Sequence, residues 1–228
     1  MSGVFGADQL PVEARAALGL QLRSAGVRDV SVMRAIERVP RELFAPHRFR
    51  DLSNRNISLP IDCGQTLPAA AGLGRWLEAL AAGPGHRVLE VGSGSGYSAA
   101  VLAQLAREVV SIERYEALAI EARERLAALS VDNARVLFAD GLAPDRSLGL
   151  FDRIVLYMAF DEPPAAALEL LAAGGAIVYG RFLPAQAGRR RRARVMRLER
   201  GANGALLAPK DCGECREGAA ISGKALAL

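Results

Sequence analysis

The sequence predicts an α/β fold built on a doubly wound, mostly parallel sheet with helices on both faces. Two observations support this prediction. Strand-like and helix-like patterns alternate from residue 69 to residue 180, as they do when parallel strands are joined by crossover helices. In addition, an apolar run over residues 87–91 leads into a glycine-rich turn over residues 92–96, as where a strand turns into a helix at the edge of such a sheet.

Two helices are predicted ahead of the sheet. The first covers residues 12–25, with Pro11 at its start, and the second covers residues 29–39 and is ended by Pro40. Residues 47–68 show little periodicity and predict a long irregular segment. A long loop in a compact domain is commonly a functional one, so this segment is a candidate part of the site.

The elements of the sheet region are assigned from their hydrophobic pattern and from the Gly and Pro residues between them. In chain order they are helix 69–82, strand 87–91, helix 97–106, strand 108–113, helix 116–129, strand 135–139, strand 151–156, helix 163–172 and strand 176–180. After residue 180 the pattern predicts a β-hairpin, and residues 210–228 carry no clear signal. We expect one domain over residues 1–228, with N-terminal helices and a loop in 1–68, a βα core in 69–180, and a hairpin with a tail in 181–228.

Length and composition fit a single α/β domain with a full core. Hydrophobic residues make up 51% of the 228 residues but aromatic ones only 5%, so the core must be built mostly from Ala, Leu and Val. No window is long and apolar enough to span a membrane, and Met1–Phe5 lacks the basic and apolar regions of a secretory signal. We expect a cytoplasmic protein without a membrane partner.

The formal net charge is +4, and an arginine-rich run at 189–194 supplies much of the excess. Such a run can bind phosphates. We favour a solvated hairpin turn, because Gly188 opens the run and an alternating segment at 196–199 follows it. Nucleic acid is therefore not expected as a partner, and no pattern indicates an oligomeric state.

The three cysteines, Cys63, Cys212 and Cys215, are too few for a disulfide framework. Cys212 and Cys215 form one Cys-x-x-Cys pair without a second pair, and both histidines, His47 and His86, lie far from it in sequence. Because a structural zinc site normally needs four ligands, we predict no metal site.

The segment Val88–Tyr97, together with Glu113, carries the pattern of an adenosine-containing cofactor site. Glycines in a turn allow positive φ angles and let a ligand approach the main chain closely. Glu113 ends the next strand about 20 residues after Gly92, where an acid in a Rossmann-like sheet binds both ribose hydroxyls. The spacing is G-x-G-x-G, whereas dinucleotide sites use G-x-G-x-x-G with a pyrophosphate on the helix N-terminus. The pattern favours S-adenosylmethionine over two weaker alternatives, a nicotinamide enzyme and a purely structural turn.

Several segments together resemble the protein-L-isoaspartate O-methyltransferases. This family has the class I methyltransferase fold and uses S-adenosylmethionine to methylate the abnormal isoaspartyl carboxylate of damaged proteins. The resemblance covers roughly residues 15–180. It rests on the segments Val39–Phe44, Leu59–Ile61 with Gly64–Thr66, Val88–Tyr97, Ser111–Arg114 and Ala139–Gly141.

The resemblance implies a role for each matching residue. Residues of the glycine turn and of the strand ends would bind the cofactor: Glu90, Gly92, Ser93, Gly94, Gly96, Tyr97, Glu113, Arg114, Asp140 and Gly141. Glu113 would bind the ribose, and Asp140 would accept a hydrogen bond from the adenine amino group unless it is only a turn residue. Gln65 and Thr66 would border the reactive methyl group as catalytic residues, and Asp62 on the same loop is a third candidate.

The chain departs from the family pattern on the acceptor side. Pro68 stands where the family has a serine that helps to orient the substrate carboxylate, and proline offers neither a hydroxyl nor a backbone donor. Asp62 and Cys63 replace a glycine and a small or polar residue, and residues 157–162 replace a run of small residues. An anionic Asp62 would repel a carboxylate unless it points away.

Carboxyl methylation fits the shortage of histidines. A carboxylate with an unperturbed pKa of about 4 is already ionised near neutrality and needs no general base. An alcohol or amine acceptor would gain from a base, for which Asp62, Asp161 and Glu162 are candidates. We therefore predict an enzyme of protein repair that methylates a peptide or protein carboxylate. The alternatives are a methyltransferase of the same fold with another acceptor and a cofactor-binding protein without catalysis.

Overall fold

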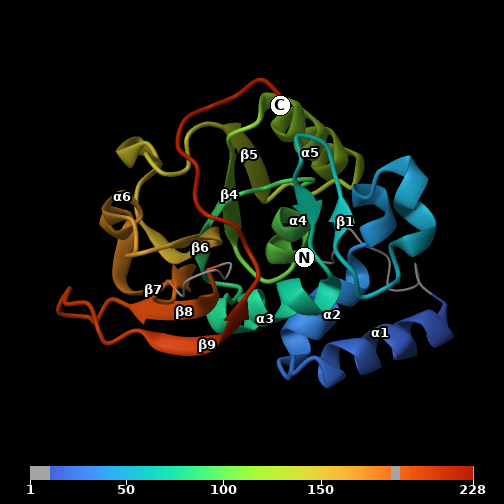
Figure 1. Ribbon diagram of the computed structural model, residues 1–228, viewed down its shortest axis with the longest axis horizontal. Coiled ribbons are helices and arrows are strands. Elements are labelled where there is room, and N and C mark those ends of the chain that lie inside the picture. The colour runs from blue at the N-terminus through green and yellow to red at the C-terminus, as the bar shows by residue number, and fades with distance from the viewer. Residues whose placement is uncertain (1–10, 186–190, 228) are drawn as a thin grey trace.

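The computed structural model describes residues 11–185 and 191–227, and its centre is a seven-stranded sheet (Figure 1). The strand order is β5-β4-β3-β6-β7-β8-β9. The strands from β5 to β7 run parallel, whereas β8 and β9 are added antiparallel at one edge. The bounds are β3 Arg87–Val91, β4 Glu108–Glu113, β5 Ala134–Phe138, β6 Phe151–Phe160, β7 Leu171–Phe182, β8 Ala193–Glu199 and β9 Lys210–Cys215. The predicted fold class is confirmed, with its antiparallel C-terminal part.

Alternate residues along the strands face two separate apolar layers. Val88 belongs to the larger layer and its neighbour Leu89 to the smaller one on the opposite face. The larger layer is covered by three helices, α3 Ala70–Leu80, α4 Tyr97–Ala103 and α5 Glu116–Ala128, and the smaller layer by α6 Ala165–Glu169. Helices therefore cover both faces of the sheet.

Two N-terminal helices, α1 Val12–Ser24 and α2 Val30–Arg38, pack against α3. The Asp29 carboxylate caps α2 by accepting hydrogen bonds from the amides of Ser31 (2.7 Å) and Val32 (3.1 Å). Glu78 of α3 in turn accepts from the Asp29 amide at 3.0 Å. These contacts tie the start of α2 to α3.

The segment 47–68 is more ordered than its lack of periodicity predicts. It begins with a short 3₁₀ helix, η2 His47–Leu52, and ends in a small hairpin of β1 Leu59–Pro60 and β2 Thr66–Leu67; another 3₁₀ helix, η1 Arg41–Phe44, precedes it. Strands of two residues are too short to produce an alternating pattern, so periodicity could not reveal them.

The expected helix over 163–172 is wrong at its C-terminal end. Helix α6 ends at Glu169, and β7 begins at Leu171, which pairs with Phe151 of β6. Gly174 has a φ of +75°, and the Gly174 amide donates to the carbonyl of Arg200 at 2.9 Å. Sheet pairing therefore overrides the helix-favouring Leu and Ala residues. Strand β6 also continues past the predicted end at residue 156.

Part of the arginine run, with Gly188, lies outside the described residues. Within the described part, Arg191 pairs with Asp161 at 2.5 Å and Arg194 with Asp211 at 2.9 Å. Arg192 and Glu214 are 3.8 Å apart. These described guanidinium groups are balanced by acids of neighbouring strands and turns.

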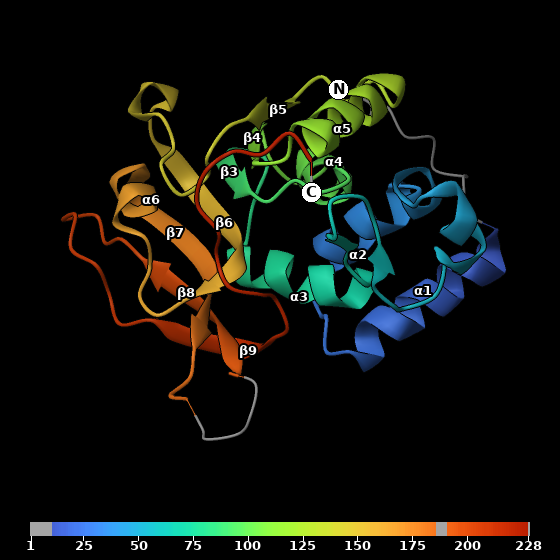
Figure 2. The ribbon, with the colours of Figure 1, turned by 45° about the horizontal axis from the view of Figure 1, so that its top comes forward.

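After β9 the chain crosses the carboxyl edge of the parallel strands (Figure 2). Ala219 forms an isolated bridge with Ala159 at the end of β6, and Ala225 forms one with Tyr115 just after β4. This C-terminal tail, residues 216–227, belongs with β9 to the region 210–228 in which the sequence shows no clear signal. Among the helices of the described chain, none has the length and apolar character needed to cross a bilayer.

Candidate active site

The turn between β3 and α4 leaves its main chain open to a ligand. Gly92, Gly94 and Gly96 have φ angles of +97°, +53° and +89°, which residues with a side chain rarely adopt. A Cβ on Gly96 would also lie only 3.0 Å from the Cβ of Ala122, so glycine lets α5 pack against the turn. The amide of Gly92 donates to the carbonyl of Ile112 at 2.8 Å, which ties the turn to β4.

Glu113 at the end of β4 faces this turn. Its side chain is 4% exposed, one carboxylate oxygen accepts from the amide of Gly94 at 2.8 Å, and the other accepts from the amide of Tyr115 at 3.0 Å. Burial raises the pKa of Glu113 and outweighs these hydrogen bonds, which act in the opposite direction. The backbone amide of Arg114 also acts on this group. The carboxylate is therefore fixed in place, and its remaining acceptor capacity faces the cleft.

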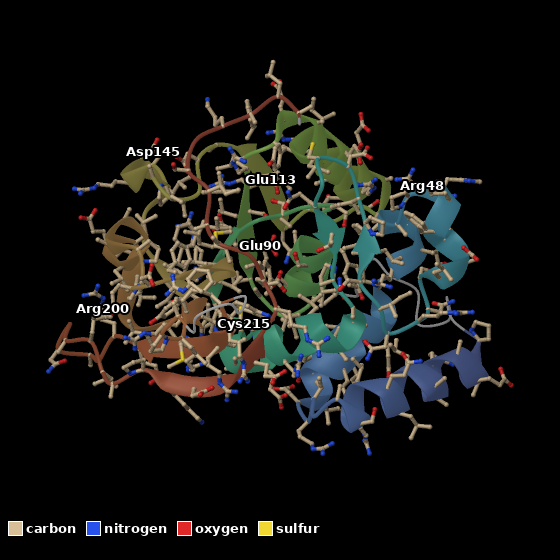
Figure 3. All side chains as sticks on the ribbon, viewed as in Figure 1. Arg48, Glu90, Glu113, Asp145, Arg200 and Cys215 are labelled. Carbon is tan, nitrogen blue, oxygen red and sulfur yellow. The ribbon has the colours of Figure 1, made fainter. Side chains whose placement is uncertain are left out.

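Glu90 lies beneath the turn on β3, beside Ser111 of β4 (Figure 3). It is fully buried, and one of its carboxylate oxygens accepts from the Ser111 hydroxyl at 2.5 Å. Ser111 also forms a hydrogen bond with the hydroxyl of Ser93 in the turn. Burial raises the pKa of Glu90 from 4.5 to about 7. The other oxygen, Oε1, has no partner among the described residues, which leaves a buried acceptor next to the turn.

A cleft opens at this edge of the sheet. Its lining comes from the hairpin, α3, the glycine turn, the ends of β4 and β6, the loop after β5 and the tail: Gln65, Thr66, Pro68, Leu73, Trp76, Val91, Gly92, Ser93, Gly94, Ser95, Tyr97, Ser98, Ile112, Glu113, Arg114, Tyr115, Gly141, Leu142, Tyr157, Met158, Glu217 and Ile221. Most of the residues predicted from the sequence therefore meet in one cavity.

Four predicted site residues do not line the cleft. Asp62 is exposed at the tip of the hairpin, so it does not face the cavity as an acid. Glu90 and Gly96 support the turn from behind. The fourth is Asp140, whose carboxylate accepts from the amides of Leu142 (2.9 Å) and Gly223 (2.7 Å). Asp140 therefore shapes the loop after β5 and holds the tail.

Arg114 lines the cleft, but its guanidinium group holds the tail as well. It donates to the carbonyls of Gly223 (3.0 Å) and Ser222 (3.4 Å) and lies over the ring of Tyr115 at 4.7 Å. The backbone carbonyl of Arg114 also accepts from the amide of Ala225 at 2.9 Å. The segment Ser111–Arg114 thus places Glu113 toward the cofactor turn and Arg114 toward the tail.

Arg41 positions the hairpin that carries Gln65 and Thr66. Its side chain is buried and donates to the carbonyls of Ser53 (2.6 Å), Ile57 (2.8 Å) and Pro68 (2.9 Å). Burial lowers the pKa of Arg41. A single guanidinium group thereby donates to backbone carbonyls on both sides of the hairpin. Its planar arrangement of five N–H donors makes this possible.

Several lining residues carry no assignment from the sequence, among them Trp76 and Glu217. Trp76 and Tyr157 pack edge to face with ring centroids 5.4 Å apart, and Glu217 reaches the cavity from the tail. Tyr157 follows the strand predicted over 151–156 and begins the divergent segment 157–162, so the sequence does place it at this edge of the sheet. Trp76 looks like any core residue of an amphipathic helix, and Glu217 lies in a segment without a pattern.

The comparisons with known proteins agree with this geometry. A family model, "Protein-L-isoaspartate(D-aspartate) O-methyltransferase (PCMT)", matches residues 13–216. The chain belongs to this family. A protein-L-isoaspartate O-methyltransferase of Rhodopseudomonas palustris strain BisB18 is 43% identical over 159 residues, which are 70% of this chain and 74% of the relative. One of Maricaulis maris is 43% identical over 170 residues, or 75% and 80% of the two chains.

Solved structures support the fold of the family. One protein-L-isoaspartate O-methyltransferase superposes with a TM-score of 0.77 at 24% identity, covering 91% of this chain and 66% of that chain. A Plasmodium falciparum structure in complex with S-adenosyl-L-homocysteine has a TM-score of 0.70 at 20% identity and covers 92% and 97% of the two chains. The predicted family and fold are thereby confirmed.

Proposed function

We propose that this protein transfers the methyl group of S-adenosylmethionine to the free carboxylate of an isoaspartyl or D-aspartyl residue in a damaged protein. The observation that carries the proposal is the single cleft in which the glycine turn and Glu113 meet Gln65 and Thr66 of the hairpin. Family membership supplies the reaction class, and the cleft supplies residues suited to its cofactor.

Three neighbouring strands would hold the cofactor. The open backbone of residues 92–96 suits its amino-acid part, the fixed carboxylate of Glu113 suits its ribose, and Gly141 with Leu142 suits its adenine. The buried carboxylate of Glu90 supports this fit from behind the turn, where the hydroxyls of Ser111 and Ser93 link it to the backbone that faces the cleft. When bound, S-adenosylmethionine supplies an electrophilic methyl group on a sulfonium.

The residues of this chain contribute mainly by position. A carboxylate acceptor is ionised near neutrality, so no proton has to be removed. Holding the acceptor oxygen about 3 Å from the methyl group supplies much of the rate enhancement. Arg41 serves this purpose indirectly by fixing the hairpin against the cleft, and the apolar rings of Trp76 and Tyr157 help to exclude water.

The test is an incubation with methyl-labelled S-adenosylmethionine and an isoaspartyl peptide, with the ordinary aspartyl peptide as control. We expect label in the isoaspartyl peptide alone. Label in neither peptide, with cofactor binding verified by calorimetry, would contradict the proposed acceptor. The cytoplasmic location and the single-domain organisation stay predictions beside this proposal.

One observation favours a second candidate, a methyltransferase of the same fold with another acceptor. Pro68 lines the cleft and carries no donor for a carboxylate. If that missing donor limits isoaspartyl methylation, Pro68→Ser raises kcat/KM for the isoaspartyl peptide, because the Pro68 carbonyl bond to Arg41 is kept and a hydroxyl is added. Unchanged kcat/KM would show that other parts of the pocket decide the acceptor.

A further inference from the structure

The tail forms a wall of the cleft and is held there at both ends. Near its start, the amide of Ala159 donates to the carbonyl of Gly218 at 2.8 Å, and the amide of Ala220 donates to the carbonyl of Ala159 at 3.2 Å. Farther along, Gly223 is bound by Arg114 and Asp140. The side chain of Glu217 therefore has a fixed origin beside the end of β6.

Glu217 is an acid that makes no ion pair in the described part of the molecule. Arg191 and Arg192, which border a second hollow together with Glu217 and Arg216, are paired with Asp161 and Glu214. The side chain of Glu217 lines the cleft, and no ion pair or hydrogen bond to its carboxylate occurs among the described residues. Burial alone raises the pKa of Glu217. Its neighbour on β9, Glu214, is more exposed and lies 3.8 Å from Arg192. The only guanidinium group among the described lining residues, that of Arg114, donates to tail carbonyls.

Tyr157 provides a second, independent sign of a ligand at the same end of the cleft. Its ring lines the cavity, and its buried hydroxyl makes no hydrogen bond of good geometry among the described residues, where Ser98 is the polar side chain that faces it. Burial, and then the negative charges of Glu90 and Glu217, raise the pKa of this phenol, whereas Ser98 acts in the opposite direction. The phenol and the Glu217 carboxylate thus line the same cleft without a well-formed polar contact, which suits a ligand that offers both an acceptor and a cation.

The strand order assigns this end of the cleft to the acceptor. The cofactor residues follow β5, β4 and β3 in turn, whereas Glu217 is anchored to β6 on the other side of β3. In Figures 1 and 2 the hairpin and the tail flank the strand ends from different sides. A peptide that reaches the methyl group between them would pass Glu217.

We propose that Glu217 selects acceptors in which a positively charged group lies beside the reacting carboxylate. This inference rests on the proposed function. A carboxylate acceptor without such a group would meet an uncompensated negative charge in a partly desolvated site, whereas a neighbouring cation would pair with Glu217 and cancel the repulsion. The occupant of this end is therefore a damaged-protein segment with a lysine, an arginine or a free amino terminus close to the isoaspartyl residue.

The experiment uses the full chain and three isoaspartyl peptides that carry lysine, alanine or glutamate on both sides of the damaged residue. Two quantities are measured: kcat/KM with S-adenosylmethionine, and the calorimetric affinity of each peptide for protein saturated with S-adenosyl-L-homocysteine. For the wild type we expect the lysine peptide to exceed the glutamate peptide by about tenfold in both, as for one partly buried ion pair. Glu217→Gln reduces the ratio to about twofold or less, and Glu214→Gln, the matched control on β9, leaves it unchanged.

The outcomes separate this inference from the proposed function. An equal preference in wild type and Glu217→Gln overturns the inference. A second result would also overturn the inference: Glu217→Gln binds S-adenosylmethionine more weakly but S-adenosyl-L-homocysteine equally well. Because only S-adenosylmethionine carries the positive sulfonium, Glu217 would then face the cofactor and not the acceptor. If the wild type binds the cofactor but methylates none of the peptides, the proposed function fails, and peptide affinities still report whether this end of the cleft prefers a cation.

Discussion

At the scale of single residues, Glu113 ties the glycine turn to the end of β4, and we predict that it binds the ribose of the cofactor. Glu113→Ala removes an acceptor of two backbone hydrogen bonds and of the expected ribose bonds. Because charge-assisted hydrogen bonds contribute roughly 1.5–3 kcal/mol each, we expect S-adenosylmethionine to bind more than about tenfold more weakly. Calorimetry measures this directly, and an unchanged affinity would contradict the role of Glu113.

Glu90 makes stability depend on pH. Its pKa is raised from 4.5 to about 7 in the folded protein, so the folded state binds the extra proton between these values. The stabilising contribution is present below about pH 4.5 and is lost as the pH rises through about 7. Relative to Glu90→Gln, which has no such titration, the wild type should lose about 3 kcal/mol of unfolding free energy between pH 4 and pH 8. Denaturant titrations at both pH values measure it; parallel pH profiles would refute it.

Gly141 tests close packing beneath the adenine side of the cleft. A Cβ at this position would collide with Cγ1 of Val91, so Gly141→Ala forces the loop after β5 away from β3. Such overpacking typically costs about 1–3 kcal/mol, and we expect a lower Tm and weaker cofactor binding. Gly85→Ala is the control, because nothing lies within 4 Å of its added Cβ. Equal Tm values for both variants would show that the loop adapts freely.

At the scale of elements, the hairpin of β1 and β2 depends on Arg41. Arg41→Met keeps an apolar stem but leaves the carbonyls of Ser53, Ile57 and Pro68 without their donor. Because unsatisfied buried polar groups cost about 1–3 kcal/mol each, we expect faster hydrogen exchange of the hairpin amides and a higher KM for the acceptor. Exchange in β3 and β4 serves as the internal reference. If the hairpin amides exchange as slowly as in the wild type, other contacts hold it.

The elements also show where sequence reasoning ends. Strands β3 and β4 and the turn at Gly92 carry local signals, since their apolar runs and positive φ angles are written in adjacent residues. Residues 171–173 have the composition of a helix, and only the pairing of Leu171 with Phe151 places them in β7. Long-range pairing of this kind leaves no periodic trace in the segment itself.

At the scale of the whole molecule, local sequence signals mark the cofactor part of the site, whereas long-range contacts build the acceptor part. The half predicted to bind the cofactor comes from one continuous motif and one acid, so the sequence alone could place Gly92, Gly94 and Glu113 at one edge of the sheet, where they line the cleft. The acceptor half combines α3, β6 and the tail, and its residues, such as Trp76 and Glu217, meet only because the chain returns across the sheet edge. Asp140 and Arg114 were expected at the cofactor, yet their polar groups hold this returning segment.

Because Arg114 holds the tail, we predict that it affects the affinity for S-adenosylmethionine through the tail and not through a direct contact with the cofactor. Deleting residues 217–228 leaves the seven-stranded sheet complete, because β9 ends at Cys215, but removes Ile221 and Glu217 from the cleft. We expect an unchanged circular dichroism spectrum and an affinity for S-adenosylmethionine lowered about tenfold by the lost wall. Arg114→Ala in the full chain should weaken binding in the same direction, since it frees Gly223 and Ser222.

Combining the two changes distinguishes a tail contact from a direct contact with the cofactor. If Arg114 works only by holding the tail, Arg114→Ala has no further effect once residues 217–228 are gone, and the two free-energy changes are strongly non-additive. If Arg114 touches the cofactor itself, the substitution weakens binding of the truncated chain as much as that of the full chain. Calorimetry measures the affinity for S-adenosylmethionine of the wild type, Arg114→Ala, the truncated chain and the truncated chain with Arg114→Ala. These four affinities decide between the two roles.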